Sequence, residues 1–410
     1  MKKLLLILIL PLLMGVGCTK INTFLDDTNV SDDSINSIVD ANNKFALDLY
    51  DKYKEKGNVF FSPYSISSAL AMTYEGAKGK TAEEIKEVFY FPEDQDEMRS
   101  AYASLYNDIN KEDKEYALST ANALWAEKEF VFLDSYFDTV KNYYGGGVTN
   151  LDFKKNPEKS RVTINNWVED KTNDKIKDLI PSGMIDSLTR LVLTNAVYFK
   201  GDWVKQFNED NTKDKNFRVT PNNTVKIPMM KYTGDEAEFK YAEDNNTQII
   251  ELLYSGEELS MLILLPKNDD LNKLEKNLSI KQLSNWKEDL VKQRVDVYIP
   301  KFKFETKYFM AEDLNEMGMP TAFGEQADFS GMTGRRDLFV SQVVHQAFIE
   351  VNEEGTEAAA ATAVVMKFLA LPGEGQKIPV FNADHPFIFL IQQNNTGNIL
   401  FMGRVNDPSK

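Results

Sequence analysis

The chain has 410 residues, of which 42% are hydrophobic and 11% aromatic, so it can bury a large core. Its 47 basic and 63 acidic residues give a formal net charge of −16, which argues against nucleic acid or an anionic membrane as a partner. Length alone suggests two or three domains. However, no internal repeat and no long linker rich in proline, serine or glycine lies between Ile38 and Val405, so we expect one large domain.

The N-terminus has the pattern of an export signal. Two lysines precede the apolar run Leu4 to Met14, which is too short to be an ordinary membrane-spanning helix. The run ends in Gly15-Val16-Gly17-Cys18, which resembles a bacterial lipoprotein cleavage site. We therefore expect residues 1–17 to be a signal peptide and Cys18 to be lipidated. The protein would be held at the outer membrane or cell surface, or be extracellular. Because Cys18 is the only cysteine, no internal disulfide is expected.

The next segments predict a tether followed by the folded domain. Residues 18–37 are largely polar, with two pairs of aspartates, and predict a tether, so the domain would span residues 38–410. Apolar residues at helical spacing predict a first helix from about Ile38 to Tyr53. A short apolar strand then leads to Ser62, placed as the N-cap of a helix whose first residue is Pro63.

The segment Gly76 to Thr81 ends in the Gly-Lys-Thr of a phosphate-binding loop. The first glycine of that motif would fall at Tyr74, and the segment follows a helix rather than a strand, so nucleotide binding is not supported. We interpret it as a helix end and a turn, with Thr81 to Glu84 capping the next helix.

Hydrophobic periodicity predicts the remaining elements. The apolar run Leu191 to Trp203 indicates a strand buried on both faces. The other predicted strands are Tyr116 to Ala126, a second sheet with Val225 to Met230, Gln248 to Leu252 and Ser260 to Pro266, then Val295 to Phe304 and Leu338 to Glu350; the predicted helices are Leu133 to Tyr143, Arg161 to about Lys175, Ile280 to Leu290 and one ending at Gly318.

The segment from Glu353 to Gly373 has contradictory local preferences. Its alanine run favours a helix, Thr362 to Val365 favours a strand, and Leu371-Pro372-Gly373 breaks both. As a strand it would carry only small or apolar residues on one face: Thr356, Ala358, Ala360, Thr362, Val364 and Met366. Taken alone, the segment favours an alanine-rich surface helix or a linker, the usual structure of such runs.

The flanks of this segment carry a resemblance to a known family. Val351 to Ala361, Phe381 to Ile391 and Asn398 to Val405 resemble the hinge, the far anchor and the C-terminal strand pair of a serpin, and Asn58 to Met72 is also similar to that family. The resemblance implies an α+β serpin fold: a single large domain with three β-sheets, about eight or nine helices and an exposed reactive-centre loop. It also implies a monomeric protease inhibitor that acts by inserting its cleaved loop into the central sheet.

The resemblance assigns roles to particular residues of the loop. It implies a reactive bond at Leu369-Ala370, with cleavage after Lys367 or Phe368 as alternatives. The expected partners are serine proteases, and cysteine proteases as a second class, held as covalent acyl-enzymes. The residues implied to form the hinge are Glu354, Gly355, Thr356, Glu357, Ala358, Ala359, Ala360 and Ala361.

Residues for catalysis are few. The chain has two histidines, His345 and His385, so neither a zinc site nor another cofactor site is expected. Ser62 with His345 would be a candidate for a serine hydrolase, but no Gly-x-Ser-x-Gly motif is present. The resemblance implies instead that Ser62, Asn195, His345 and Trp203 govern the opening of the central sheet. A non-inhibitory serpin that acts as a surface binding protein is the alternative function.

Overall fold

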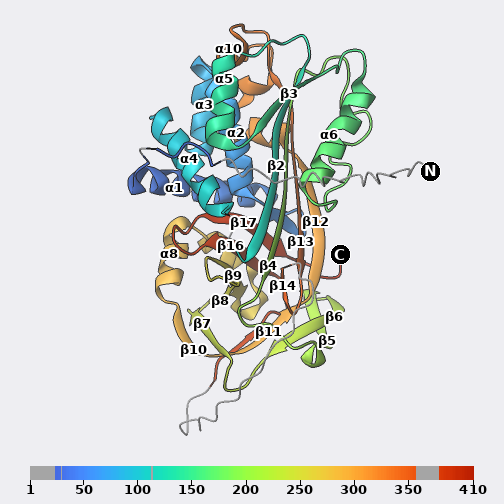
Figure 1. The fold of residues 1–410 in the computed structure, drawn as a ribbon. Helices are drawn as coiled ribbons and strands as arrows, with labels where there is room; N and C mark the ends of the chain where they lie inside the picture. Colours follow the sequence, from blue (N-terminus) through green and yellow to red (C-terminus); the bar gives the residue numbers. More distant parts are fainter. Residues whose placement is uncertain (1–23, 29, 112–113, 357–377) are drawn as a thin grey trace, which may run out of the picture.

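The computed structural model describes residues 24–28, 30–111, 114–356 and 378–410. These residues form three β-sheets and ten α-helices in one α+β domain (Figure 1). The predicted fold class and number of sheets are confirmed. The described residues contain ten α-helices, where the resemblance implies about eight or nine; one of the ten, α10 (Ser330–Thr333), has only four residues.

The central sheet runs the length of the molecule and contains Gly355 and Thr356, two of the predicted hinge residues. Its fourth strand in order, β4, is nearly all buried, as its apolar sequence predicts. Helix α6 (Pro157–Lys171) covers one face of the sheet through Ile164 and Val168 (Figure 1). The strand order is β12 (Phe302–Phe309), β13 (Val340–Val351), β14 (Gly355–Thr356), β4 (Leu191–Asp202), β2 (Tyr116–Glu127) and β3 (Gly147–Leu151).

Two further sheets pack at the end of the molecule where the hinge lies. The seven-stranded sheet has the order β1 (Val59–Phe61), β17 (Ile399–Val405), β16 (Phe387–Gln393), β9 (Leu259–Pro266), β8 (Thr247–Leu253), β7 (Glu238–Glu243) and β10 (Val291–Arg294). The four-stranded sheet has the order β15 (Val380–Asn382), β11 (Asp296–Pro300), β6 (Asn223–Tyr232) and β5 (Lys213–Thr220).

Two predicted strands differ from the structure: one lies in another sheet, and the other is in fact two strands. The predicted strand Val225 to Met230 lies in β6 of the four-stranded sheet, and not beside β8 and β9. The predicted strand Val295 to Phe304 is two strands, β11 and β12, which belong to different sheets. Both halves of that segment alternate between buried and exposed residues, so periodicity cannot reveal the change of sheet at Lys301.

Most helices gather at the opposite end of the central sheet (Figure 1). Helix α2 (Pro63–Gly76) begins with Ser62 as N-cap and Pro63 as its first residue, as predicted. The remaining helices are α1 (Asp32–Tyr53), α3 (Gly79–Phe89), α4 (Gln95–Ile109), α5 (Asp134–Tyr144), α7 (Leu271–Asn277), α8 (Ile280–Glu288) and α9 (Met310–Met317). Within the described ranges, no helix combines the length and apolar character needed to cross a membrane.

Two helix starts differ from the prediction. Helix α1 begins at Asp32, six residues before Ile38, because Ser31 accepts a hydrogen bond from the Ser34 N–H as N-cap. Leu25 is also buried, so this part of the predicted tether packs on the domain. Helix α3 begins at Gly79, and Thr81 does not cap it. The Thr81 hydroxyl instead accepts a hydrogen bond from the backbone of Asp328.

Candidate functional site

The candidate site is the boundary between β4 and β13, which we call the seam (residues 191–198 and 340–348). Along the seam the two strands pair directly and in parallel, from Leu191 opposite Val340 to Tyr198 opposite Phe348. Beyond this point β14 lies between them, antiparallel to both. The boundary between β4 and β13 is therefore closed along the seam. Beyond the seam, Gly355 and Thr356 of β14 separate the two strands.

Backbone hydrogen bonds hold the chain at this end, which we call the hinge end (residues 352–356 and their contacts). The backbone N–H of Trp203 donates to the Glu354 carbonyl at 2.7 Å, and its indole N–H donates to the Asn352 carbonyl at 3.1 Å. The Trp203 ring stacks on Tyr254 with centroids 4.5 Å apart. The Tyr254 hydroxyl is 2.7 Å from the hydroxyl of Thr356. Trp203 thus supports the chain where β14 enters the sheet.

The Glu353 side chain adds an ionic contact to the hinge end. It is almost fully buried, lies 2.6 Å from Lys301 Nζ and accepts a hydrogen bond of 2.7 Å from Thr212. Burial raises the pKa of Glu353, but the hydrogen bonds from Lys301 and Thr212 outweigh it and hold this pKa below its ordinary value. The carboxylate therefore stays ionised and connects the hinge end to Thr212, which directly precedes β5, and to Lys301 between β11 and β12.

Gly355 allows the closest approach of the hinge to β4. A Cβ atom at this position would lie 2.2 Å from the Gly201 carbonyl oxygen and 2.6 Å from the Asp202 Cα. Both are backbone atoms, which cannot move aside as a flexible side chain would. Only glycine fits here with β14 paired to β4.

In the middle of the seam, side chains from four elements form a hydrogen-bonded chain. The Ser62 N–H donates to His345 Nε2 at 3.2 Å, so the ring proton lies on Nδ1, which donates to Asn195 Oδ1. Asn195 Nδ2 then donates to the hydroxyl of Ser65 at 2.6 Å and to Asn122 Oδ1 at 2.5 Å. Of these contacts, the His345–Asn195 bond crosses the seam directly.

Burial sets the charge state of this chain. His345 is fully buried, and desolvation lowers its pKa from 6.5 to about 3. The ring is neutral at physiological pH, in the form that accepts from Ser62 and donates to Asn195. Opening the seam would leave these groups without their partners, which costs free energy.

The structure brings three of the four predicted sheet-opening residues together. Ser62, Asn195 and His345 form one chain, whereas Trp203 lies at the hinge end with Glu354 and Thr356. The predicted hinge residues Glu357 to Ala361, the predicted bond at Leu369-Ala370 with its alternatives Lys367 and Phe368, and Cys18 lie outside the described residues.

Sequence reasoning missed several residues of the site. Ser65 and Asn122 complete the hydrogen-bonded chain, and Glu353, Lys301 and Tyr254 hold the hinge end. Asn122 had a detectable signal, since it is a polar residue between Ala121 and Ala123 in a predicted strand. The Glu353–Lys301 pair had none, because 52 positions separate the two residues in the sequence.

Comparisons with known proteins decide the family. The family model described as "Serpin (serine protease inhibitor)" matches residues 40–408. The chain belongs to the serpin family. An uncharacterised serpin-like protein from Methanosarcina acetivorans is 43% identical over 97% of this chain and 96% of its own length. A leukocyte elastase inhibitor from Equus caballus is 43% identical over 90% of this chain and 98% of its own.

A solved structure agrees with the fold of this serpin. Human thyroxine-binding globulin, crystallised with its hormone, superimposes with a TM-score of 0.83 at 32% identity, over 92% of this chain and 100% of that one. The family model and this structural similarity both confirm the α+β serpin fold that the sequence resemblance implies.

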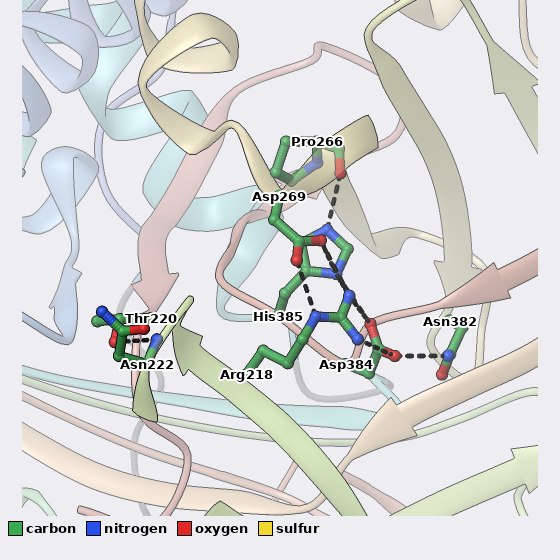
Figure 2. A network of polar contacts seen from close by, with 8 residues as sticks. All are labelled: Arg218, Thr220, Asn222, Pro266, Asp269, Asn382, Asp384 and His385. Carbon is green, nitrogen blue, oxygen red and sulfur yellow. Dashed lines mark hydrogen bonds and ion pairs between the residues drawn. The ribbon is translucent and has the colours of Figure 1, made fainter. Parts of the chain in front are cut away.

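The segment around Asp384, which resembles the far anchor of a serpin loop, takes part in a compact ionic network (Figure 2). Arg218 on β5 contacts Asp269 at 2.8 Å and Asp384 at 2.9 Å. His385 Nε2 lies 2.7 Å from the Pro266 carbonyl oxygen, so it carries a proton, and Nδ1 lies 2.9 Å from Asp384. These contacts join the β15–β16 connection to β5 and to the segment Pro266 to Asp269, so the contacts of His385 are structural.

Within the part of the chain that the structure describes, no group of three or more histidine, cysteine, aspartate or glutamate side chains could hold a metal ion. The Ser62 hydroxyl donates to the Leu400 carbonyl at 2.7 Å and is buried, and His345 contacts its backbone N–H rather than its hydroxyl. The geometry therefore does not support the hydrolase alternative, since His345 is not placed to activate the Ser62 hydroxyl.

Proposed function

We propose that this serpin is a suicide inhibitor of serine endopeptidases, with cysteine endopeptidases as a second class. The protease cleaves the loop at Leu369-Ala370 and forms an acyl-enzyme on Leu369. The hinge then inserts as a new strand between β4 and β13, and the attached protease is distorted before water hydrolyses the ester. The observation that carries this proposal is β14, which already lies between the two strands.

The register of β14 defines how insertion would continue. Thr356 is opposite Gly201 on β4 and Val351 on β13, so each later residue would pair one position earlier on both strands. Ala358 would come level with Phe199 and Ile349, and Thr362 level with Asn195 and His345. The side chain of Thr356 points to the core, so residues of the same parity would do so too. They are the small and apolar residues that such burial requires.

The register also suggests what replaces the bond across the seam. Insertion must separate His345 from Asn195, because the new strand would lie between them. Thr362 would bring a hydroxyl to that level, and a hydroxyl can both accept from the His345 Nδ1–H and donate to Asn195 Oδ1. The polar groups that insertion separates would thereby regain partners.

Apolar residues at the predicted reactive bond favour proteases with apolar primary pockets. We propose cleavage at Leu369-Ala370, with Lys367 and Phe368 as alternative residues before the cut. Similarity to the leukocyte elastase inhibitors of horse and human supports an elastase-like or chymotrypsin-like target.

The test of the reactive bond is to mix the protein with chymotrypsin, elastase, trypsin and subtilisin. A complex that survives denaturation, with a released peptide starting at Ala370, is expected; a peptide starting at Phe368 would move the bond to Lys367.

Two neighbouring substitutions test insertion itself. Ala358→Arg would place a charge on the core side of the inserted strand, so we expect it to convert the inhibitor into a substrate. Glu357→Arg adds the same side chain on the opposite face, level with Lys200 and Glu350, and is the matched control. We expect a large drop in the fraction of trapped protease for Ala358→Arg only. Equal complex formation by both variants would refute insertion in this register.

The alternative function is that of a non-inhibitory serpin that binds a ligand or partner at the cell surface. The structural similarity to thyroxine-binding globulin, solved with thyroxine, is the observation that favours it. Clean cleavage by every protease, with no complex that survives denaturation, would favour this alternative.

We also propose that residues 1–17 are removed as a signal peptide and that Cys18 carries a lipid, which would place the inhibitor at the outer membrane or cell surface. The support is the sequence pattern alone. Mass spectrometry of the N-terminal peptide should find a diacyl or triacyl modification, and Cys18→Ala should release the protein from the membrane fraction. An unmodified Cys18 peptide would refute the anchor.

A further inference from the structure

Three aromatic rings and one cation form a column from the protein surface to the middle of the seam. Lys56 Nζ, on a half-exposed side chain, lies 4.3 Å from the centroid of the Tyr53 ring. The Tyr53 ring stacks on Tyr308 with centroids 4.2 Å apart and planes 9° apart. Tyr308 in turn lies parallel to the His345 ring, with centroids 6.2 Å and planes 10° apart.

The column joins three elements through buried side chains. Tyr53 is the last residue of α1, Tyr308 is on β12, and His345 is its direct partner in the β12–β13 register. All three rings are at least nine-tenths buried. The Tyr53 hydroxyl donates to Asp313 Oδ2 at 2.7 Å, which fixes its ring against α9. The side of the seam that carries His345 is therefore held to the helical layer.

The stack and the hydrogen bonds restrain different motions of the imidazole. The bonds to Ser62 and Asn195 lie in the plane of the ring and fix its two nitrogens. The Tyr308 ring lies parallel to that plane and opposes rotation of the imidazole out of it. Only the observed orientation places the Nδ1 proton on Asn195 while Nε2 accepts from Ser62. A tilted ring would lose one of these bonds.

We propose that Tyr308, supported by Tyr53, is a positioning residue that holds the His345 imidazole in the orientation that keeps the seam closed. For its effect on inhibition this inference rests on the proposed function. The orientation of the ring and the opening of the seam can be measured without any protease, so the two can fail separately. The ring of Tyr308 contacts the rings of Tyr53 and His345 and lies near the Lys56 ammonium group, and its strand pairs with β13.

The test compares Tyr308→Leu, which removes the ring, with Tyr308→Phe, which keeps it. The chain has two histidines, so selective ¹⁵N-histidine labelling gives NMR signals only from His345 and His385. We expect Tyr308→Leu to shift the His345 imidazole signals and to mix its tautomers, with His385 unchanged. Amide hydrogen exchange in residues 191–198 and 340–348 should become roughly 2- to 10-fold faster, the range expected for one lost aromatic stack. Tyr308→Phe should restore both measurements.

A second buried tyrosine provides the matched control. Tyr136 stacks on Phe132 with centroids 5.8 Å apart, away from the seam, and Tyr136→Leu should lower global stability without changing the His345 signals.

If wild type forms protease complexes, Tyr308→Leu should also lose inhibitory activity on storage roughly 2- to 10-fold faster. Should Tyr308→Leu fail to fold, Tyr53→Leu makes the same test from the outer ring. Unchanged His345 signals in the folded variant, or equal seam exchange in Tyr308→Leu and Tyr136→Leu, would overturn the proposal.

Discussion

The hinge end and the middle of the seam are two parts of one boundary, and they differ in what holds them. At the hinge end the boundary is already occupied by β14, which is held by backbone hydrogen bonds and by the Glu353–Lys301 ion pair. In the middle β4 and β13 pair directly, and the His345–Asn195 bond joins their side chains. Insertion would thus start at β14, whereas the residues that resist opening, His345 and Asn195, lie in the middle of the seam. Substitutions at the two places should have different consequences.

The largest effect is expected from Glu353→Lys at the hinge end. It would place two ammonium groups together where the pair now lies 2.6 Å apart, and it would leave Thr212 without its acceptor. Breaking a buried ion pair costs about 3–5 kcal/mol, and because Lys301 is 37% exposed we expect about 2–4 kcal/mol. Denaturant unfolding of the intact protein measures the loss.

Glu353→Gln is the control for charge. The pKa of Glu353 is depressed in the folded state, so its pair stabilises the fold above pH 4.5, the ordinary value, and this contribution is lost as the pH falls through the folded pKa. Glu353→Gln should therefore weaken the protein at pH 7, and this loss should shrink as the pH falls through the folded pKa of Glu353. A loss that does not change with pH would argue against an ionic role for the hinge end.

The next largest effect is a pH dependence from the middle of the seam. His345 has a folded pKa of about 3 against 6.5 when unfolded. Between these values the unfolded chain takes up a proton that the folded chain excludes. Stability should therefore fall as the pH decreases, by about 1.4 kcal/mol per pH unit from this group. The effect is absent above about pH 7.

His345→Gln tests this dependence, because glutamine cannot titrate. The difference in unfolding free energy between wild type and variant should shrink steadily from pH 7 to pH 4, since the carboxylates contribute equally to both proteins. A difference that stays constant over this range would mean that His345 has the same pKa in the folded and unfolded protein, so that burial does not lower it.

A smaller effect should come from Thr356, which is already inserted. Thr356→Val keeps the shape of the side chain but removes its hydrogen bond to Tyr254, so we expect a loss of about 1 kcal/mol. A double-mutant cycle with Tyr254→Phe isolates the pair. Additive losses from the two single substitutions would show that the hydroxyls do not interact.

Thr362→Val should have the smallest effect on the intact protein and a measurable one after cleavage. If Thr362 pairs with Asn195 and His345 after insertion, the variant should weaken the cleaved protein by about 1 kcal/mol and leave the intact protein unchanged. Unfolding of both forms by guanidinium measures this. An equal change in both forms would contradict the inserted register.

The local features of this serpin could be predicted from its sequence, and the contacts between distant segments could not. Strand β4 follows from its apolar run, and the start of α2 follows from Ser62 and Pro63. The pairing of His345 with Asn195 required the family resemblance, because no periodicity relates residues 150 positions apart. The split between β11 and β12 and the early start of α1 were missed because both depend on which sheet or surface the segment meets.

The parallel pairing of β4 with β13 has a consequence for how long the intact molecule lasts. If the proposed insertion occurs, it would exchange one ladder of hydrogen bonds for two, so the intact chain would be metastable and the cleaved form would lie lower in free energy. The lifetime of the intact protein would then be set by the rate at which the seam opens. A thermal scan of the intact protein should give a midpoint that moves with heating rate, and shelf life at constant temperature is the quantity by which variants of this seam should be ranked.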